Sequence, residues 1–220
     1  MDIQKKNREL LKKNHVYNEQ MEHDACGVGL VASTEGLKSR KVVEYGIQAL
    51  KAVWHRGAID ADGKTGDGAG IHIEIPKDFF EEKIEITGHK HDNSDLCVGM
   101  IFLPRNDFSG QEQCRTIVES ELTKKNFNIY GWRQVPVDPS VLGEKAEQTR
   151  PEITQVLFTN NDKSITGKNL ERLLYETRRK IEKEALKNQL NNLYICSESL
   201  KVYMVVPIIF AYIFYTIDET

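Results

Sequence analysis

The chain has 220 residues, of which 40% are hydrophobic and 29% charged, with a formal net charge of −3. This composition is typical of a globular protein with one large domain or two small ones. It contains no basic stripe with interleaved aromatic residues, so nucleic acid is not expected as a partner. The four cysteines (Cys26, Cys97, Cys114 and Cys196) form no CxxC pair, which favours free thiols over a disulfide framework.

The two ends of the chain have distinct compositions. Residues 1–20 lack the apolar core of a secretory signal, and residues 3–14 predict a marginal, exposed helix. That helix is compatible with a propeptide, although composition alone favours a frayed N-terminal helix. Residues 202–217 are almost entirely apolar, but the run is shorter than the roughly 20 residues that span a bilayer. A membrane is therefore not expected as a partner, and a short membrane-associating tail is the alternative.

The first third of the chain predicts strand, helix, loop and strand. Residues 26–33 (CGVGLVAS) predict a strand with glycines where another backbone comes close. Residues 41–54 predict a helix, because apolar residues recur there at helical intervals (Val43, Ile47, Leu50 and Trp54). A polar, glycine-rich loop at 60–70 precedes residues 71–75, where isoleucines alternate with polar residues as in a half-buried strand.

The rest of the chain mixes helices and strands without regular alternation. The helices are predicted at 77–83, 110–125 and 168–190, the strands at 96–103, 128–137, 153–158 and 193–196, and an exposed loop at 87–95. The last helix places four apolar residues on its inner side (Leu170, Leu173, Leu174 and Ile181). This irregular order predicts an α+β fold rather than a doubly wound sheet.

Cys26 is the candidate nucleophile. A thiol attacks an acyl group as its thiolate and therefore needs a base. If the chain is cut before Cys26, the freed α-amino group is such a base, with an ordinary pKa of about 7.7–8.0. From the residues alone, a buried and inert cysteine at the start of a strand remains the alternative.

Two further motifs could build a site around Cys26. Arg56 can bind a carboxylate through two hydrogen bonds, or it can simply offset the dipole at a helix C-terminus. The loop Thr65-Gly66-Asp67-Gly68-Ala69-Gly70 lacks the lysine and the following helix of a phosphate-binding loop. It can line a pocket with Asp67 as its anchor, or be a structural turn. The histidines and cysteines complete no zinc-ligand set, so no metal is expected.

Together these motifs resemble the glutamine amidotransferase domain at the start of the large subunit of glutamate synthase. Five motifs occur in the family's order over about residues 21–198. They are His23-Asp24-Ala25-Cys26-Gly27-Val28-Gly29, Trp54-His55-Arg56-Gly57, Ala61-Asp62 with Thr65-Gly66-Asp67-Gly68-Ala69-Gly70-Ile71, Ile75-Pro76 with Phe79-Phe80, and Gly131-Trp132-Arg133-Gln134-Val135-Pro136.

The resemblance implies an N-terminal-nucleophile hydrolase fold, an αββα sandwich of antiparallel sheets, here incomplete at the C-terminus. It implies that Cys26 attacks the side-chain amide of glutamine, forms a glutamyl thioester and releases ammonia, and that Arg56 binds the α-carboxylate of glutamine. The pocket would be lined by Gly27, His55, Gly57, Asp67 and Gly68. FMN, an iron–sulfur cluster and 2-oxoglutarate would belong to synthase domains on the same polypeptide. The expected location is the cytoplasm, or a plastid in a photosynthetic eukaryote.

The chain also departs from the family. It contains no Asn-Gly dipeptide to supply the oxyanion hole, and losing one such donor typically costs about 10²–10³ in rate. We therefore expect this chain alone to be weakly active or inactive. The resemblance fades after Ser197, which predicts a propeptide at 1–25, a partial amidotransferase domain at 26–200 and a divergent apolar tail at 201–220. Another class-II amidotransferase and an inactive fragment are the alternatives, although the former usually begin almost directly at the cysteine.

Overall fold

The computed structural model describes residues 28–37, 39–53, 59–66, 68–92 and 94–199, together with the backbone of 201–206. Its elements, in chain order, are α2 (Arg40–Ala52), β1 (Ala69–Glu74), α3 (Lys77–Ile86), β2 (Leu96–Leu103), α4 (Phe108–Lys124), β3 (Phe127–Gln134), the 3₁₀-helix η2 (Pro139–Val141), α5 (Glu144–Thr149), β4 (Glu152–Asn160), α6 (Gly167–Lys187), β5 (Tyr194–Ser199) and β6 (Lys201–Val206).

The larger sheet has four antiparallel strands in the order β3-β4-β2-β5. Strand β2 lies inside it and is buried at all eight positions, so its sequence is an unbroken apolar run rather than an alternating one. Close packing also explains why β2 contains a glycine, Gly99. A Cβ on Gly99 would lie 2.7 Å from Cγ1 of Val156 on β4, so the two strands accommodate no side chain there.

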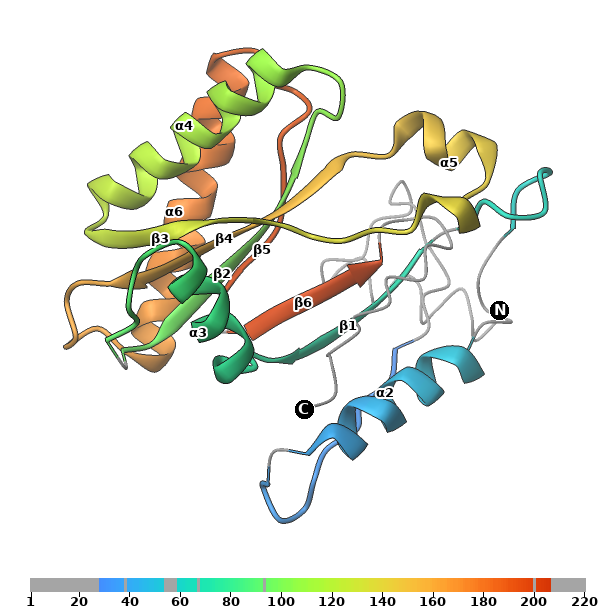
Figure 1. Cartoon of the computed structure of the whole chain (residues 1–220), viewed down its shortest axis with the longest axis horizontal. Coiled ribbons are helices and arrows are strands. Elements are labelled where there is room, and N and C mark those ends of the chain that lie inside the picture. The colour runs from blue at the N-terminus through green and yellow to red at the C-terminus, as the bar shows by residue number, and fades with distance from the viewer. Residues whose placement is uncertain are drawn as a thin grey trace, which may run out of the picture.

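Helices α4 and α6 cover one face of the larger sheet, as Figure 1 shows. The core between these two helices and the sheet contains Leu170, Leu174 and Ile181 of α6, all fully buried. Burying a side chain of this size stabilises the fold by roughly 1.5–3 kcal/mol. Asp107 caps α4 by accepting a hydrogen bond from the Gly110 amide. The helix therefore starts at Phe108, two residues before its predicted start.

The opposite face of the larger sheet carries a second core, to which α3 contributes. Phe80 and Ile84 of α3 pack there with Leu96, Val98, Tyr130 and Leu157 of the sheet. Ile75, which directly follows β1, joins the same cluster. Residue 75 thus ties the end of the smaller sheet to the larger one.

The smaller sheet consists of β1 and β6, which pair antiparallel from Ala69–Val206 to Glu74–Lys201. A single residue, 200, separates β6 from β5, so the chain leaves the larger sheet and enters the smaller one almost without a connection. Helix α2 contacts β1, and Figure 1 shows it on the side of β1 away from the larger sheet. Helices α4 and α6, the larger sheet, the smaller sheet and helix α2 therefore follow one another in that order.

The structure confirms the predicted α+β class and nearly all the predicted elements. One predicted strand is wrong in its described part. Residues 28–33 form no strand, and the side chains of Val28 and Leu30 are each 92% exposed. The short apolar run with its two glycines suggested a strand, but no partner strand runs beside this segment among the described residues. The predicted helix at 3–14 and the apolar residues 207–217 lie outside the described part of the chain.

Candidate active site

Most predicted site residues fall outside the described part of the chain. These are Cys26, Gly27, His55, Arg56, Gly57 and Asp67. Gly68 is described, and it directly precedes β1 with a φ of 100°. That backbone conformation strongly favours glycine, so the local conformation alone explains why residue 68 is a glycine. Its role in lining a pocket stays a prediction.

The other three cysteines are poor candidates for a nucleophile. Cys97 and Cys114 are buried in the core below α4 and α6, and Cys196 is half-buried on β5. Burial raises the pKa of the Cys97 and Cys114 thiols. It raises the pKa of Cys196 to about 11. At neutral pH all three stay thiols, which are far weaker nucleophiles than thiolates. This leaves Cys26 as the cysteine to consider.

Residues 59–66 form a small hairpin between two of the predicted site motifs. Ile59 and Gly66 form an antiparallel bridge, and the Asp60 amide donates to the Thr65 carbonyl at 2.7 Å. The hairpin is preceded by 54–58, which contains the His55-Arg56-Gly57 motif, and followed by 67–68. Because its two ends are paired, Ile59 and Gly66, which adjoin these two segments in the sequence, lie next to each other.

A carboxylate, Asp62, organises the turn of the hairpin. It accepts hydrogen bonds from the amides of Lys64 and Thr65 and from the Thr65 hydroxyl, at 2.9, 2.7 and 2.5 Å. These donors favour the charged form and lower the pKa of Asp62 to about 2. Gly63, with a φ of 67°, provides the left-handed residue of the turn. Asp62 therefore anchors the described part of this loop. The predicted role of Asp67, which lies outside the described residues, stays a prediction.

The hairpin contacts the start of α5, about 80 residues further along the chain. The Lys145 ammonium lies 2.7 Å from a carboxylate oxygen of Asp60, which lowers the pKa of Asp60. Gly143 approaches so closely that a Cβ there would collide with the side chains of Asp62 and Thr65. Sequence reasoning missed both Gly143 and Lys145, because neither stands in a recognisable motif.

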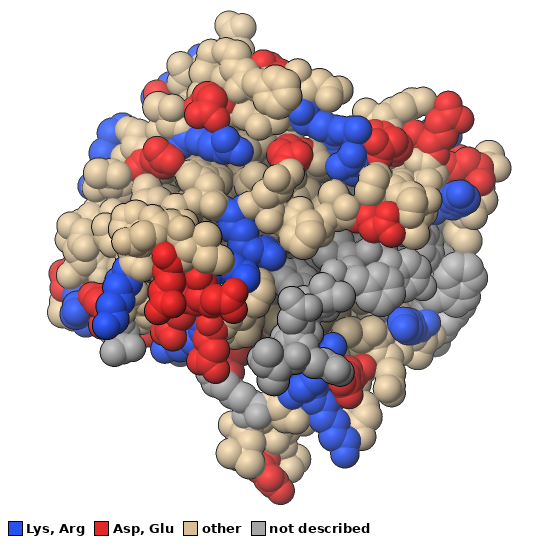
Figure 2. Space-filling model, in the orientation of Figure 1, with Lys and Arg blue, Asp and Glu red and all other residues tan. Residues whose placement is uncertain are grey.

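The described residues also form a pocket of about 440 Å³ on the side of the larger sheet that α4 covers. It is lined by Arg105, Phe108, Gln111, Arg115, Trp132, Arg133, Gln134, Glu152 and Thr154. Arg105 and Arg115 are paired with Glu147 and Glu112, so their charges are largely balanced. Figure 2 shows basic and acidic side chains interspersed on the visible face, with an acidic patch over α3.

The described residues contain neither a metal-ligand cluster nor a membrane-spanning helix. No group of three or more His, Cys, Asp or Glu side chains in that part of the chain could hold a metal ion. No helix there is long and apolar enough to cross a membrane.

Three related proteins have long stretches in common with this chain. The glutamate synthase [NADPH] large chain of Azospirillum brasilense is 51% identical over 195 residues, which are 89% of this chain and 13% of that protein. The ferredoxin-dependent glutamate synthase of Pyropia yezoensis is 36% identical over 184 residues (82% and 12%). Ferredoxin-dependent glutamate synthase 1, chloroplastic/mitochondrial, of Arabidopsis thaliana is 38% identical over 180 residues (81% and 11%). This chain thus spans only 11–13% of the length of these relatives.

The family described as "Glutamine amidotransferases class-II" matches residues 26–212. The match begins at Cys26, the predicted nucleophile, and runs past residue 200 through the whole of β6. Antiparallel sheets with helices on their outer sides agree with the N-terminal-nucleophile hydrolase fold expected from the resemblance. The chain belongs to the class-II glutamine amidotransferases.

Proposed function

We propose that this chain is the glutaminase part of a glutamate synthase, with Cys26 as the first residue of the mature domain and as its nucleophile. The observation that carries the proposal is the family match, which begins at Cys26 and continues to residue 212. The relatives named glutamate synthase support the choice of parent enzyme. The raised pKa values of the Cys97, Cys114 and Cys196 thiols support Cys26 by elimination.

In the proposed reaction the α-amino group of Cys26 takes the thiol proton. The thiolate sulfur attacks the side-chain carbonyl carbon of glutamine, and a tetrahedral intermediate forms. The C–N bond breaks, and the amine returns the proton so that ammonia leaves. Water then attacks the resulting thioester, releasing glutamate and the thiol. The sum is glutamine plus water giving glutamate plus ammonia, with no redox change.

Substrate recognition is proposed to come from the two segments that flank the hairpin. Arg56 would bind the α-carboxylate of glutamine, because its planar fork matches a carboxylate with two parallel hydrogen bonds. Gly27, His55, Gly57, Asp67 and Gly68 would line the pocket. The hairpin at 59–66 supports this arrangement, since Ile59 and Gly66, which adjoin the two segments in the sequence, are paired.

The remaining steps are proposed for polypeptide outside this chain. There the ammonia would react with 2-oxoglutarate in synthase domains that carry FMN and an iron–sulfur cluster. The described cysteines, two buried and Cys196 half-buried, belong to no group of side chains in the described part of the chain that could hold a metal ion. We propose a cytoplasmic location, or a plastid in a photosynthetic organism; the name of the Arabidopsis relative places that protein in the chloroplast and mitochondrion.

Glutamate release from glutamine by the purified chain tests the proposal. We expect slow activity that disappears in Cys26→Ser, since a serine hydroxyl is a much weaker nucleophile here. Activity that survives Cys26→Ser would contradict the role of Cys26. A second variant, Arg56→Lys, should raise the KM for glutamine more than it lowers kcat. An unchanged KM would remove Arg56 from the substrate site.

A further inference from the structure

The pocket beside α4, of about 440 Å³, lies at one end of the larger sheet. Strand β2 ends there at Leu103, and the chain continues through Arg105 to α4. Glu152, the first residue of β4, pairs with Leu103. Gln134, the last residue of β3, pairs with Thr154. The volume falls within the range of roughly 300–1,000 Å³ that is typical of small-molecule sites. All of the lining residues are described, and the proposed glutaminase reaction uses none of them.

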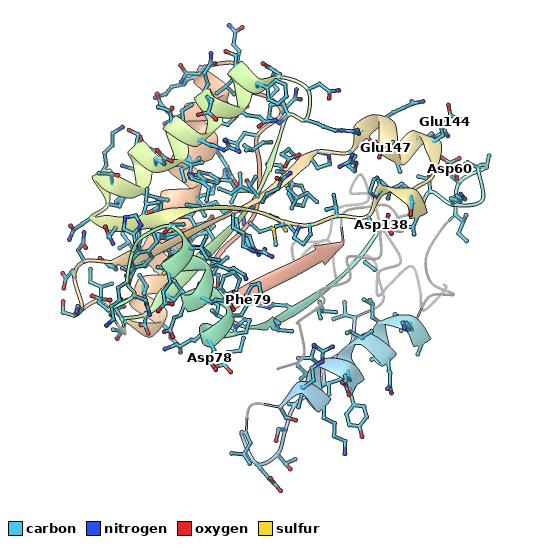
Figure 3. The ribbon with its side chains drawn as sticks, viewed as in Figure 1. Asp60, Asp78, Phe79, Asp138, Glu144 and Glu147 are labelled. Carbon is cyan, nitrogen blue, oxygen red and sulfur yellow. The ribbon has the colours of Figure 1, made fainter. Side chains whose placement is uncertain are left out.

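Two arginines that line the pocket use only part of their hydrogen-bonding capacity. Arg105 donates through Nη1 to the carboxylate and the backbone carbonyl of Glu147, which lies on α5 (Figure 3). Arg115 donates through Nη1 to Glu112 at 2.7 Å. A guanidinium has five N–H donors, and the remaining ones have no acceptor in the described part of the chain. Neither glutamate lines the pocket, so the two arginines line it while their acidic partners lie outside.

Among the described residues that line the pocket, Glu152 alone is acidic. It accepts a hydrogen bond from the side-chain amide of Gln134 at 2.6 Å, and no described lysine, arginine or histidine forms an ion pair with it. The third arginine of the lining, Arg133, donates to Gln155 and lies over the Phe79 ring. One pocket therefore contains a carboxylate and guanidinium groups that are not paired with each other.

This arrangement of charges favours a zwitterion over a simple ion. Glu152 would repel an anion, and the guanidinium groups of Arg105 and Arg115 would repel a cation. A ligand that carries both charges, with no net charge, satisfies both sides of the pocket. The planar fork of an arginine matches a carboxylate, and an ammonium group can donate to the carboxylate of Glu152. A free α-amino acid is a small molecule with these two groups.

The apolar part of the lining is aromatic. Phe108, the first residue of α4, lines the pocket and is 76% exposed. Trp132 lines it as well, and its ring is held by a hydrogen bond from Nε1 to Glu119 at 2.6 Å. Arg115 lies over that ring, 5.6 Å from its centroid. The exposed ring of Phe108 is therefore the surface available to the side chain of a ligand, and an aromatic ring is a suitable partner for it.

We propose that this pocket binds a free α-amino acid with an aromatic side chain. Arg105 and Arg115 bind its carboxylate, Glu152 binds its ammonium group, and Phe108 packs against its ring. The inference goes beyond the proposed function and does not depend on it, because no residue of the proposed glutamine site takes part. A chain that hydrolyses glutamine without binding an aromatic amino acid would contradict this inference alone.

Equilibrium dialysis of the purified chain compares L-phenylalanine with 3-phenylpropanoate, which lacks only the ammonium group. We expect saturable binding of one L-phenylalanine per chain, and about tenfold weaker binding of 3-phenylpropanoate, since a charge-assisted hydrogen bond is lost. In Glu152→Gln, which keeps an acceptor for Gln134, L-phenylalanine should bind about tenfold more weakly and 3-phenylpropanoate no more weakly than before. The matched control is Glu85→Gln, at an exposed position of α3, which should bind both compounds like the wild type.

A second variant decides the matter if Glu152→Gln does not fold. Arg115→Gln should weaken the binding of L-phenylalanine and of 3-phenylpropanoate alike, because both carry the carboxylate. It should not weaken the binding of phenethylamine, which has the ammonium group alone. A wild-type chain that shows no saturable binding of L-phenylalanine overturns the inference. So does a Glu152→Gln protein that loses affinity equally for L-phenylalanine and 3-phenylpropanoate, or L-phenylalanine binding that neither variant changes.

Discussion

Strand β2 of the larger sheet is buried at all eight positions, whereas β1 of the smaller sheet has no buried residue. Helix α2, which lies on the smaller sheet, has none either, while α6 on the larger sheet has five. Four of the five family motifs lie in residues 23–80, the stretch that also contains α2 and β1. The proposed function thus assigns the chemistry to the half of the molecule with fewer buried residues, and the larger sheet is the better packed half.

Because the smaller half has so few buried residues, its position depends on a few contacts with the larger half. Ile75 packs into the core under α3. Strand β5 continues into β6 after one residue. Helix α5 holds the hairpin at 59–66. Local displacements in the smaller half should therefore affect reactivity long before they unfold the protein.

The largest expected effect is a loss of stability in the larger half. Phe158 of β4 is fully buried and makes an edge-to-face contact with Phe127, with ring centroids 5.2 Å apart. Phe158→Ala should lower the free energy of unfolding by about 3–5 kcal/mol, since it leaves a cavity. Ile47→Ala in α2, where the side chain is only half-buried, should cost about 1 kcal/mol. Urea unfolding measures both, and equal losses would refute the contrast between the halves.

The next effect depends on pH and comes from a buried carboxyl at the edge of the larger sheet. Glu198 of β5 is 8% exposed, and one of its carboxyl oxygens lacks a hydrogen-bond partner. Burial raises the pKa of Glu198 to about 8, partly opposed by Arg178 and assisted by Glu182. The folded protein therefore keeps a proton that the unfolded chain releases above its ordinary pKa of 4.5. Stability should fall as pH rises from about 4.5 to 8.

Glu198→Gln removes this titration. The variant should be more stable than the wild type at pH 7, by on the order of 3 kcal/mol, because a shift of one pKa unit corresponds to about 1.4 kcal/mol. The advantage should vanish near pH 4. Glu85→Gln, at an exposed position of α3, is the control and should leave the pH profile unchanged. A Glu198→Gln profile that is parallel to the wild-type profile would mean that Glu198 is ionised in the folded protein.

The smallest effect is local to the hairpin. Asp62→Asn keeps an acceptor but removes the charge that strengthens its hydrogen bonds to Lys64 and Thr65. We expect faster hydrogen exchange at these two amides with little change in global unfolding. In the wild type, the lowered pKa of Asp62 means that its contribution is present above its ordinary pKa of 3.8 and disappears as pH falls through about 2. Unchanged exchange in Asp62→Asn would show that the turn does not depend on this carboxylate.

The sequence predicted the larger half well, because burial on both faces leaves a clear pattern. The apolar run at 96–103 became β2 without any change of its bounds. Strand β5 was predicted too short, since it continues through Ser197 and Glu198, which are polar and yet buried. The early start of α4 could have been recognised from Asp107, a typical capping residue.

The smaller half was harder to predict. Its stretches are polar or alternate between apolar and polar residues, and such a pattern does not show which other segments they contact. Val28 and Leu30 suggested a strand, but a hydrophobic pattern does not state whether a partner strand is present. The loop at 60–70 was expected from its glycines and aspartates. Its contact with Gly143 was not, because a steric contact between segments so far apart in sequence leaves no local signal.

Mass spectrometry of the purified chain, after reaction with a glutamine analogue that carries an electrophilic diazoketone, tests whether Cys26 is the nucleophile. We predict a mature species that begins at Cys26 and carries a single adduct on that residue. Cys97, Cys114 and Cys196 should stay unmodified, because burial raises the pKa of each thiol. An adduct on any of these three cysteines, or an uncut chain that the analogue does not modify, would contradict the assignment of Cys26 as the nucleophile.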